Sequence, residues 1–206
     1  MDLTNFMDDL RAPTGAPGGG AAAAVAGAMG CALFQMVAGV TLSLARFTEG
    51  RDRLEEIRLA SEMLHKRFLS LAGEDANAYK QVEAALKMPR STPEEKTQRR
   101  KAMQDAFVGA TESPLKTVEA AIEAMGLLPD LLKYGNPNAI TDIGVGFLML
   151  DAARRGAAMN AEINLGSIKD EEFKAASSTR LENAKKRAGE HLPELETAME
   201  QAGLTV

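Results

Sequence analysis

The run PTGAPGGGAAAAVAGAMGCALFQMVAGVTLSLAR, from Pro13 to Arg46, decides the fold of this chain. Pro17 fixes its backbone φ angle, and the three glycines after it permit a turn and a close approach by other segments. From about Gly19 to Ala45 the run has no proline and is mostly small and apolar, which predicts one helix of roughly 40 Å. Neighbours can approach such a thin helix closely. We therefore expect an all-α fold, a bundle of long helices around a central Ala/Gly-rich helix.

The same run is long enough to cross a membrane, because it exceeds about 20 residues without a charge. It is rich in Ala and Gly instead of Leu and Ile, however, and it contains Gln35 and Thr41. The segment before it carries Asp2, Asp8 and Asp9, unlike the basic start of a secretory signal peptide. We expect a soluble core helix and no membrane contact.

Composition restricts the class of protein. A chain of 206 residues suits one domain, so residues 1–206 are expected to form a single helical domain. The net charge of −5 argues against nucleic-acid binding. One Cys and two distant His residues exclude an internal disulfide and leave no zinc-ligand cluster. The free thiol is typical of a reducing compartment, and we expect a cytoplasmic protein.

Apolar residues at three- and four-residue spacing predict further amphipathic helices. The first covers residues 2–11, and a second covers about 51–72 and resumes after an interruption at Gly73. Thr92, Pro93 and Glu95 then combine a capping box with a proline at the first helical position, which predicts a helix start.

Three more helices are expected in the second half of the chain. Ser113–Pro114 repeats the cap-plus-proline pattern and predicts a new start, and Pro129 is expected to end or kink that helix. Asn138 is expected to cap a helix that stops at Gly166, and Asp170 to cap the last one. No strand pattern or internal repeat is present.

Several polar residues lie where a purely structural helix does not need them. They are Gln35 and Thr41 in the apolar run, Asn136, Asn138 and Asp142 around a loop-to-helix junction, and Asn160 and Asn164 one turn apart. Two interpretations stay open: helix caps and buried hydrogen bonds, or contacts to a ligand. The same holds for Gly18–Gly20, which is either a plain helix start or a set of exposed N–H groups that bind an anion or a carbonyl.

Five motifs occur in order along nearly the whole chain. They are APGGGAAAAVAGAMG…MVAGVT from Ala16, DANAY at 75–79, MPRSTPEEK at 88–96, GNPNAITDIGV at 135–145 and MNAEINL at 159–165. Together they resemble the formiminotetrahydrofolate cyclodeaminase and methenyltetrahydrofolate cyclohydrolase family. This all-helical domain is also found C-terminal in the bifunctional formiminotransferase-cyclodeaminase.

The sequence departs from that family in one place. After the Thr that ends the long helix, the family commonly has a Gly, basic residues and an aromatic residue. Here the segment reads TLSLARF, so only Arg46 and Phe47 remain. The departure puts in doubt a site for the anionic glutamate tail of folate, or a catalytic Lys, unless Arg46 substitutes.

The resemblance implies chemistry on tetrahydrofolate one-carbon units without a metal or redox cofactor. The preferred expectation is hydrolysis of 5,10-methenyltetrahydrofolate to 10-formyltetrahydrofolate, since the chain carries no formiminotransferase domain. The alternatives are a formiminotetrahydrofolate cyclodeaminase, which releases ammonia to form the methenyl bridge, and a helical folate-binding protein without activity. Because the family forms dimers, we also expect a homodimer with the ligand groove near the subunit interface.

The resemblance also suggests roles for individual residues. Asp142 is the first candidate for the carboxylate that balances the cationic bridge, and Asp75 is the second. Groups expected to orient water or substrate, to let the backbone approach it or to pair with its glutamate are Gln35, Asn136, Asn160, Asn164, Thr41, Gly18, Gly19, Gly20 and Arg46.

Overall fold

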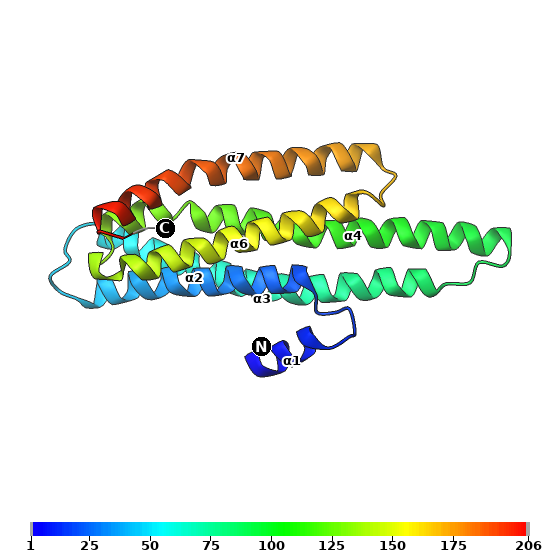
Figure 1. Ribbon diagram of the computed structural model, residues 1–206, viewed down its shortest axis with the longest axis horizontal. Helices are drawn as coiled ribbons and strands as arrows, with labels where there is room; N and C mark the ends of the chain where they lie inside the picture. Colours follow the sequence, from blue (N-terminus) through cyan, green and yellow to red (C-terminus); the bar gives the residue numbers. More distant parts are fainter. Residues whose placement is uncertain (1, 205–206) are drawn as a thin grey trace.

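The computed structural model describes residues 2–204, and within that range all regular structure is helical (Figure 1). This confirms the predicted all-α class. The elements are α1 (Leu3–Arg11), α2 (Gly19–Ser43), α3 (Arg51–Lys87), α4 (Pro93–Met125), α5 (Leu128–Tyr134), a 3-10 turn η1 (Pro137–Ala139), α6 (Ile140–Leu165) and α7 (Glu171–Gln201).

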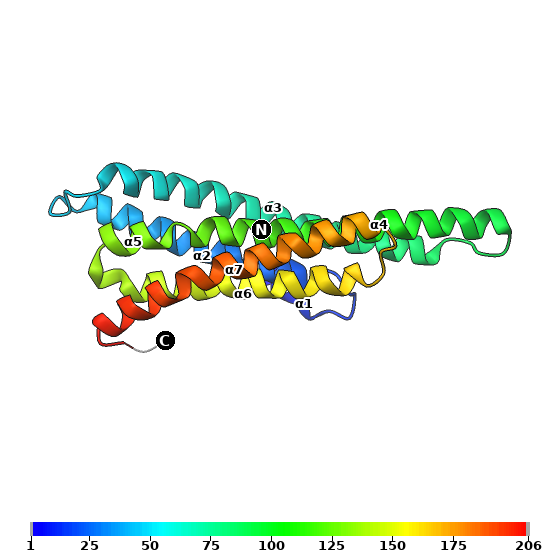
Figure 2. The same ribbon diagram turned by 90° about the horizontal axis from the view of Figure 1, so that it is seen from above.

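The long helices α2, α3, α4 and α6 run side by side, and α7 lies along α4 and α6 (Figures 1 and 2). Small residues allow α2 to pack closely against its neighbours. A Cβ atom at Gly27 would overlap the ring of Phe68 on α3, and one at Gly30 would lie 2.7 Å from the carbonyl oxygen of Gly146 on α6. The Ala/Gly-rich composition of α2 thus sets how near α3 and α6 come to it.

One side of α2 is not covered by other helices. Met29, Met36 and Val40 are each at least 40% exposed, although the opposite side of the helix is fully buried. Within residues 2–204, α2 is the one helix long and apolar enough to cross a membrane by length and composition. In the bundle, 56% of its most apolar stretch is buried.

Two long helices continue through positions where the sequence predicts a break. The helix α3 continues through Gly73, whose missing Cβ would meet no other atom, so neither packing nor a turn interrupts it there. The helix α4 continues through Pro114, which costs one i to i−4 hydrogen bond because proline has no N–H. The carbonyl of Ala110 that loses this partner accepts instead from the side chain of Asn164 on α6, at 2.8 Å.

Among the other boundary signals, some are confirmed and some are wrong. Thr92 and Glu95 form the predicted capping box, and Asp170 caps α7 by accepting from the N–H of Phe173. The prediction for Asn138 is wrong, since the side chain that caps is that of Asn136, at the start of η1. The helix α4 already ends at Met125, and Pro129 lies instead in the first turn of α5.

The C-terminal half of α3 and the N-terminal half of α4 extend beyond the other helices (Figures 1 and 2). They form a two-helix hairpin that is joined at its tip by residues 88–92. The base of this hairpin meets the N-terminus of α2 and the C-terminal half of α6.

Candidate functional site

A cavity of about 330 Å³ lies where the hairpin joins the bundle. It is walled by the segment before α2 and by α2, α3, α4 and α6, which are far apart in the sequence. The lining residues are Gly15, Gly18, Gly19, Gly20, Asp75, Ala76, Tyr79, Val82, Phe107, Ala110, Asn160 and Asn164. Six of the predicted site residues therefore come together: the three glycines, Asp75 and the two asparagines.

Asp75 faces the N-terminus of α2. The N-cap residue Gly18 has no side chain to accept from the first turn of the helix, and the carboxylate of Asp75 accepts from the N–H of Ala21 instead. Burial raises the pKa of Asp75 above its ordinary value, and this hydrogen bond opposes the rise. A carboxyl group with a raised pKa inside a cavity is suited to accept and return a proton.

Two glycines leave the space that the cavity needs. A Cβ at Gly20 would overlap the carboxylate of Asp75, so no other residue fits there without moving that group. Gly15 has a φ of 76°, and a Cβ at this position would overlap the hydroxyl group of Tyr79. The glycine-rich run therefore allows its backbone to lie against α3, as is required if the backbone is to approach a bound ligand closely.

Asn160 and Asn164 on α6 both line the cavity. Their Nδ2 atoms are used within the protein, since Asn160 donates to the carbonyl of Gly156 at 2.8 Å and Asn164 donates to that of Ala110. The Oδ1 atoms are then left to accept from N–H or O–H groups of a ligand or water. The two helix-spaced amides are thus held in fixed orientations by their own donors.

The structure adds aromatic and apolar walls that sequence reasoning did not assign to the site. Tyr79 lies one turn after Asp75 in the DANAY motif, so the four-residue spacing was a usable signal. Phe107 on α4 also lines the cavity. A flat heterocycle can be held between such rings.

Thr41 and Asn136 lie at the other end of α2, where they hold a loop in place. Thr41 is fully buried; its Oγ1 donates to the carbonyl of Val37 at 2.7 Å and accepts from the N–H of Asn136 at 2.9 Å. Asn136 accepts in turn from the N–H of Asn138. These contacts connect the end of α2 to the loop before α6.

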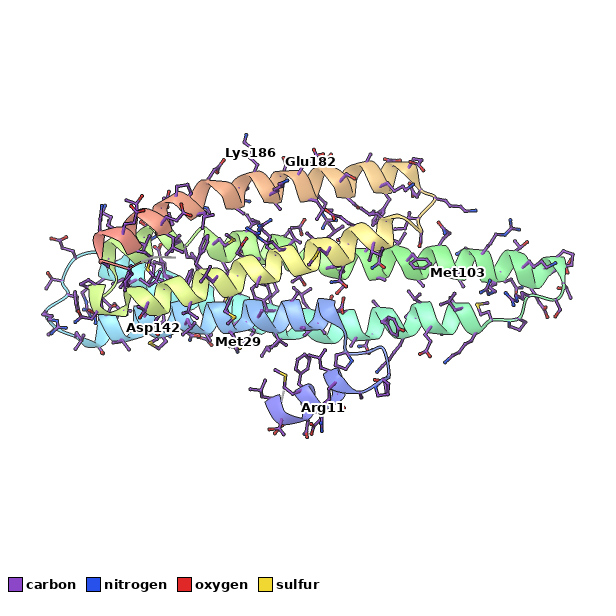
Figure 3. The ribbon with its side chains drawn as sticks, viewed as in Figure 1. Arg11, Met29, Met103, Asp142, Glu182 and Lys186 are labelled. Atoms are coloured by element: carbon purple, nitrogen blue, oxygen red, sulfur yellow. The ribbon has the colours of Figure 1, made fainter. Side chains whose placement is uncertain are left out.

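Gln35, Arg46 and Asp142 also lie outside the cavity. Asp142 is in the first turn of α6, where a negative charge interacts favourably with the helix dipole, and it is about 27 Å along the helix from Asn160. Figure 3 places its side chain at the end of the bundle remote from the projecting hairpin. Arg46 is exposed in the α2–α3 loop, over the ring of Phe47. Within one chain, therefore, Asp75 is the predicted catalytic carboxylate that lines the cavity.

Within residues 2–204, no group of three or more His, Cys, Asp or Glu side chains is placed to hold a metal ion. The chemistry available at the cavity is that of one carboxyl group, two amides, a phenol and the backbone N–H groups of a helix N-terminus.

Comparison with known proteins agrees with the motifs. Residues 2–183 match the model of the formiminotransferase-cyclodeaminase family. The chain is 33% identical over 201 residues to a methenyltetrahydrofolate cyclohydrolase of Methylorubrum extorquens, covering 98% of this chain and 90% of that protein. It is 31% identical over 202 residues to the formimidoyltransferase-cyclodeaminase of Rattus norvegicus, covering 96% of this chain but 37% of the longer rat protein.

The fold agrees with a solved structure as well. The formiminotetrahydrofolate cyclodeaminase of Thermotoga maritima superposes with a TM-score of 0.87 at 27% sequence identity, over 98% of this chain and 97% of that one. The resemblance seen in the motifs is therefore confirmed across the full length of the fold. From the match over residues 2–183 and these relatives, the chain belongs to the formiminotransferase-cyclodeaminase family.

Proposed function

We propose that this protein hydrolyses 5,10-methenyltetrahydrofolate to 10-formyltetrahydrofolate at the cavity around Asp75. The observation that carries the proposal is a carboxyl group of raised pKa beside two oriented amides and two aromatic rings. The cyclohydrolase of Methylorubrum extorquens, which this chain matches over nearly the length of both proteins, supports this reaction.

In this proposal Asp75 takes part in both halves of the reaction. As a carboxylate it balances the cationic methenyl bridge and accepts a proton from the water that attacks the bridge carbon. When the resulting carbinolamine collapses, its C–O(H) group becomes the formyl carbonyl and the bond from carbon to N5 breaks. Asp75 returns its proton to N5, and the hydroxyl proton leaves to solvent.

The other residues of the cavity bind and orient in this proposal. The Oδ1 atoms of Asn160 and Asn164 accept from N–H groups of the pterin or from the attacking water. Tyr79 and Phe107 hold the heterocycle between apolar surfaces. Gly18–Gly20 allow the backbone at the start of α2 to lie against the ligand.

The test measures the decay of the methenyl absorbance on addition of enzyme. We expect wild-type protein to accelerate it and Asp75→Asn to lower kcat at least about a hundredfold, as is typical for loss of a general acid–base group. Asp105→Asn, a matched change at an exposed ion pair with Lys101, is expected to leave the rate unchanged. Retained turnover by folded Asp75→Asn would contradict the assignment. Asp142→Asn, measured alongside, tests the other predicted carboxylate.

A second candidate is the cyclodeaminase reaction, which the close structural match to the Thermotoga maritima enzyme favours. It forms the same bridge from a formimino group and passes through a tetrahedral carbon between the same two nitrogens. Release of ammonia from formiminotetrahydrofolate, without hydrolysis of the methenyl compound, would favour this reaction over the first. Binding of folate without either turnover would favour a non-catalytic protein.

We also propose that the protein is a homodimer that pairs through the outer side of α2 and α6. Seven large apolar side chains on these adjacent helices are 40% to 74% exposed: Met29, Met36, Val40, Val145, Leu148, Met159 and Ile163. Together they expose on the order of 600 Å² of apolar surface, at the upper limit for the largest patch of a typical monomer. No charged residue occurs in α2, and a second copy would offer the same apolar face in a two-fold arrangement.

Sedimentation of wild-type protein tests this proposal, with a dimer mass expected. Met36→Glu is expected to give monomers, because it places a charge in the apolar face. Met63→Glu is the control, since Met63 is 67% exposed on α3, outside this face. A monomeric wild type, or equal effects of the two substitutions, would contradict the proposed interface.

A further inference from the structure

We propose that the projecting α3–α4 hairpin binds the aminobenzoyl and glutamate parts of a folate whose pterin lies in the cavity. The proposal rests on the function proposed above, and it assigns an orientation to the folate bound at that site. It assigns the ligand's anionic end to Arg100 and Lys96, on the opposite end of the molecule from Arg46.

The residues that carry the proposal share one continuous face of the hairpin. On α3 they follow spacings of four, three and four: Asp75, Tyr79, Val82 and Leu86. On α4 they follow spacings of three, four, three and four: Ala110, Phe107, Met103, Arg100 and Lys96. Residues at these spacings lie on the same side of a helix. The face therefore begins inside the cavity and continues outward to the hairpin tip.

The chemistry of this face changes in a fixed order. Its inner end is polar, at Asp75 and the two asparagines of α6. The next part is apolar: Leu86 is 49% exposed, and Met103 lies on the projecting part of α4 (Figure 3). The outer part is cationic, with Arg100 and Lys96 roughly 15 and 21 Å from Ala110 along α4 at 1.5 Å per residue.

A folate presents matching groups in the same order. Its pterin is polar and flat, its benzoyl group is apolar and aromatic, and its glutamate carries carboxylates. The cavity of about 330 Å³ is near the lower end of ligand-site volumes. It is suited to the pterin, and the rest of the molecule then extends outside, where the hairpin is the adjacent surface.

The charge of the hairpin supports the anionic end of this assignment. Residues 80–101 contain seven Lys or Arg and three Asp or Glu, in a chain of net charge −5. Lys87 and Lys101, on other sides of the helices, form ion pairs with Glu83 and Asp105. Among the ion pairs of residues 2–204, none includes Lys96 or Arg100. Guanidinium and ammonium groups recognise carboxylates, so these two are available to the glutamate.

The experiment compares two ligands that differ in the glutamate alone, tetrahydrofolate and tetrahydropteroate, by calorimetry on the full-length protein. The variants are Arg100→Gln with Lys96→Gln, and Met103→Ser. The control is Lys80→Gln, which removes one charge from the same hairpin on a different side of α3. Turnover of methenyltetrahydrofolate is measured on the same samples.

We expect the double variant to weaken tetrahydrofolate binding by about twofold to thirtyfold, the range for two exposed charge pairs, and to leave tetrahydropteroate binding unchanged. Met103→Ser should weaken both ligands, and Lys80→Gln neither. Equal losses for the two ligands in the double variant, or no loss for tetrahydrofolate, would overturn the proposal. If either of these outcomes is found while the wild-type protein still turns over methenyltetrahydrofolate, the subsite proposal is wrong and the proposed function stands. Ligand discrimination without turnover would instead support the subsite and contradict the enzymatic activity.

Discussion

The hydrogen bond from Asn164 to the carbonyl of Ala110 should be energetically coupled to Pro114, four residues further along α4. In a regular helix that carbonyl accepts from the N–H of residue 114, which proline lacks. Asn164 Nδ2 lies 2.8 Å from it and supplies the missing donor across the α4–α6 contact. The proline thus frees an acceptor that fixes the orientation of a cavity-lining side chain.

The test is a double-mutant cycle with Asn164→Ala and Pro114→Ala. In the wild-type background, Asn164→Ala should lower the free energy of unfolding by about 1 kcal/mol, the net value of one such hydrogen bond. In the Pro114→Ala background the helix N–H satisfies the carbonyl, so the same change should cost little. We therefore expect a coupling energy of about 1 kcal/mol.

Urea unfolding followed by far-UV circular dichroism at one fixed protein concentration gives the four free energies. With a slope of about 3 kcal/mol/M, 1 kcal/mol shifts the midpoint by about 0.3 M. Asn160→Ala is the matched control, because its amide donates to the carbonyl of Gly156, a residue of its own helix. The reasoning would be refuted if Asn164→Ala lowered the free energy of unfolding equally in the wild-type and Pro114→Ala backgrounds. It would also be refuted if Asn160→Ala showed the same coupling energy with Pro114→Ala as Asn164→Ala does.

Three further predictions concern Asp75, two glycines and the buried Cys31. Burial raises the pKa of Asp75 in the folded state, so ionisation of this side chain lowers the stability of the fold at pH values above the pKa of Asp75 in the unfolded chain. Asp75→Asn should therefore be at least as stable as wild type at pH 7. Urea midpoints should show this difference shrinking as the pH falls and Asp75 becomes protonated. Gly20→Ala should lower turnover at least about tenfold, because the added Cβ displaces the Asp75 carboxylate. Gly73→Ala, where a Cβ meets no atom, should stabilise the fold by about 0.8 kcal/mol. Similar losses of activity in the two variants would contradict the proposed displacement of Asp75. Burial, and to a lesser degree the charge of Glu123, raises the pKa of Cys31 to about 12, so a thiol reagent at pH 8 should label it at the unfolding rate and no faster.

Local signals predicted most of the helices correctly. The capping box at Thr92–Glu95 and the cap at Asp170 depend on hydrogen bonds that reach three residues, so the sequence contains all the information they need. Pro114 was misread as a helix start for the opposite reason. Its lost hydrogen bond is compensated by Asn164, 50 residues further along the chain, which local sequence cannot reveal.

The candidate site was predicted in part. Gly18–Gly20, Asp75, Asn160 and Asn164 were singled out by motif and do share a cavity. The motifs could not show that Asp142 lies about 27 Å along α6 from Asn160, because residue type carries no information about which end of a bundle a group occupies. Phe107 was missed because an aromatic residue at helical spacing has the same pattern whether it faces a core or a ligand.

The sequence by itself determined that the chain is helical, which helix is thin enough for close packing, and where most helices start, because propensity, capping and residue volume act over one or two turns. Only the tertiary structure decided which polar groups meet. The antiparallel packing of α2 against α6 brings Gly19 to Asn160, and the lateral packing of α3 brings Asp75 to the N-terminus of α2. Those contacts arise from burying apolar faces between helices that are distant in sequence, and this packing also leaves the α3–α4 hairpin projecting beside the cavity.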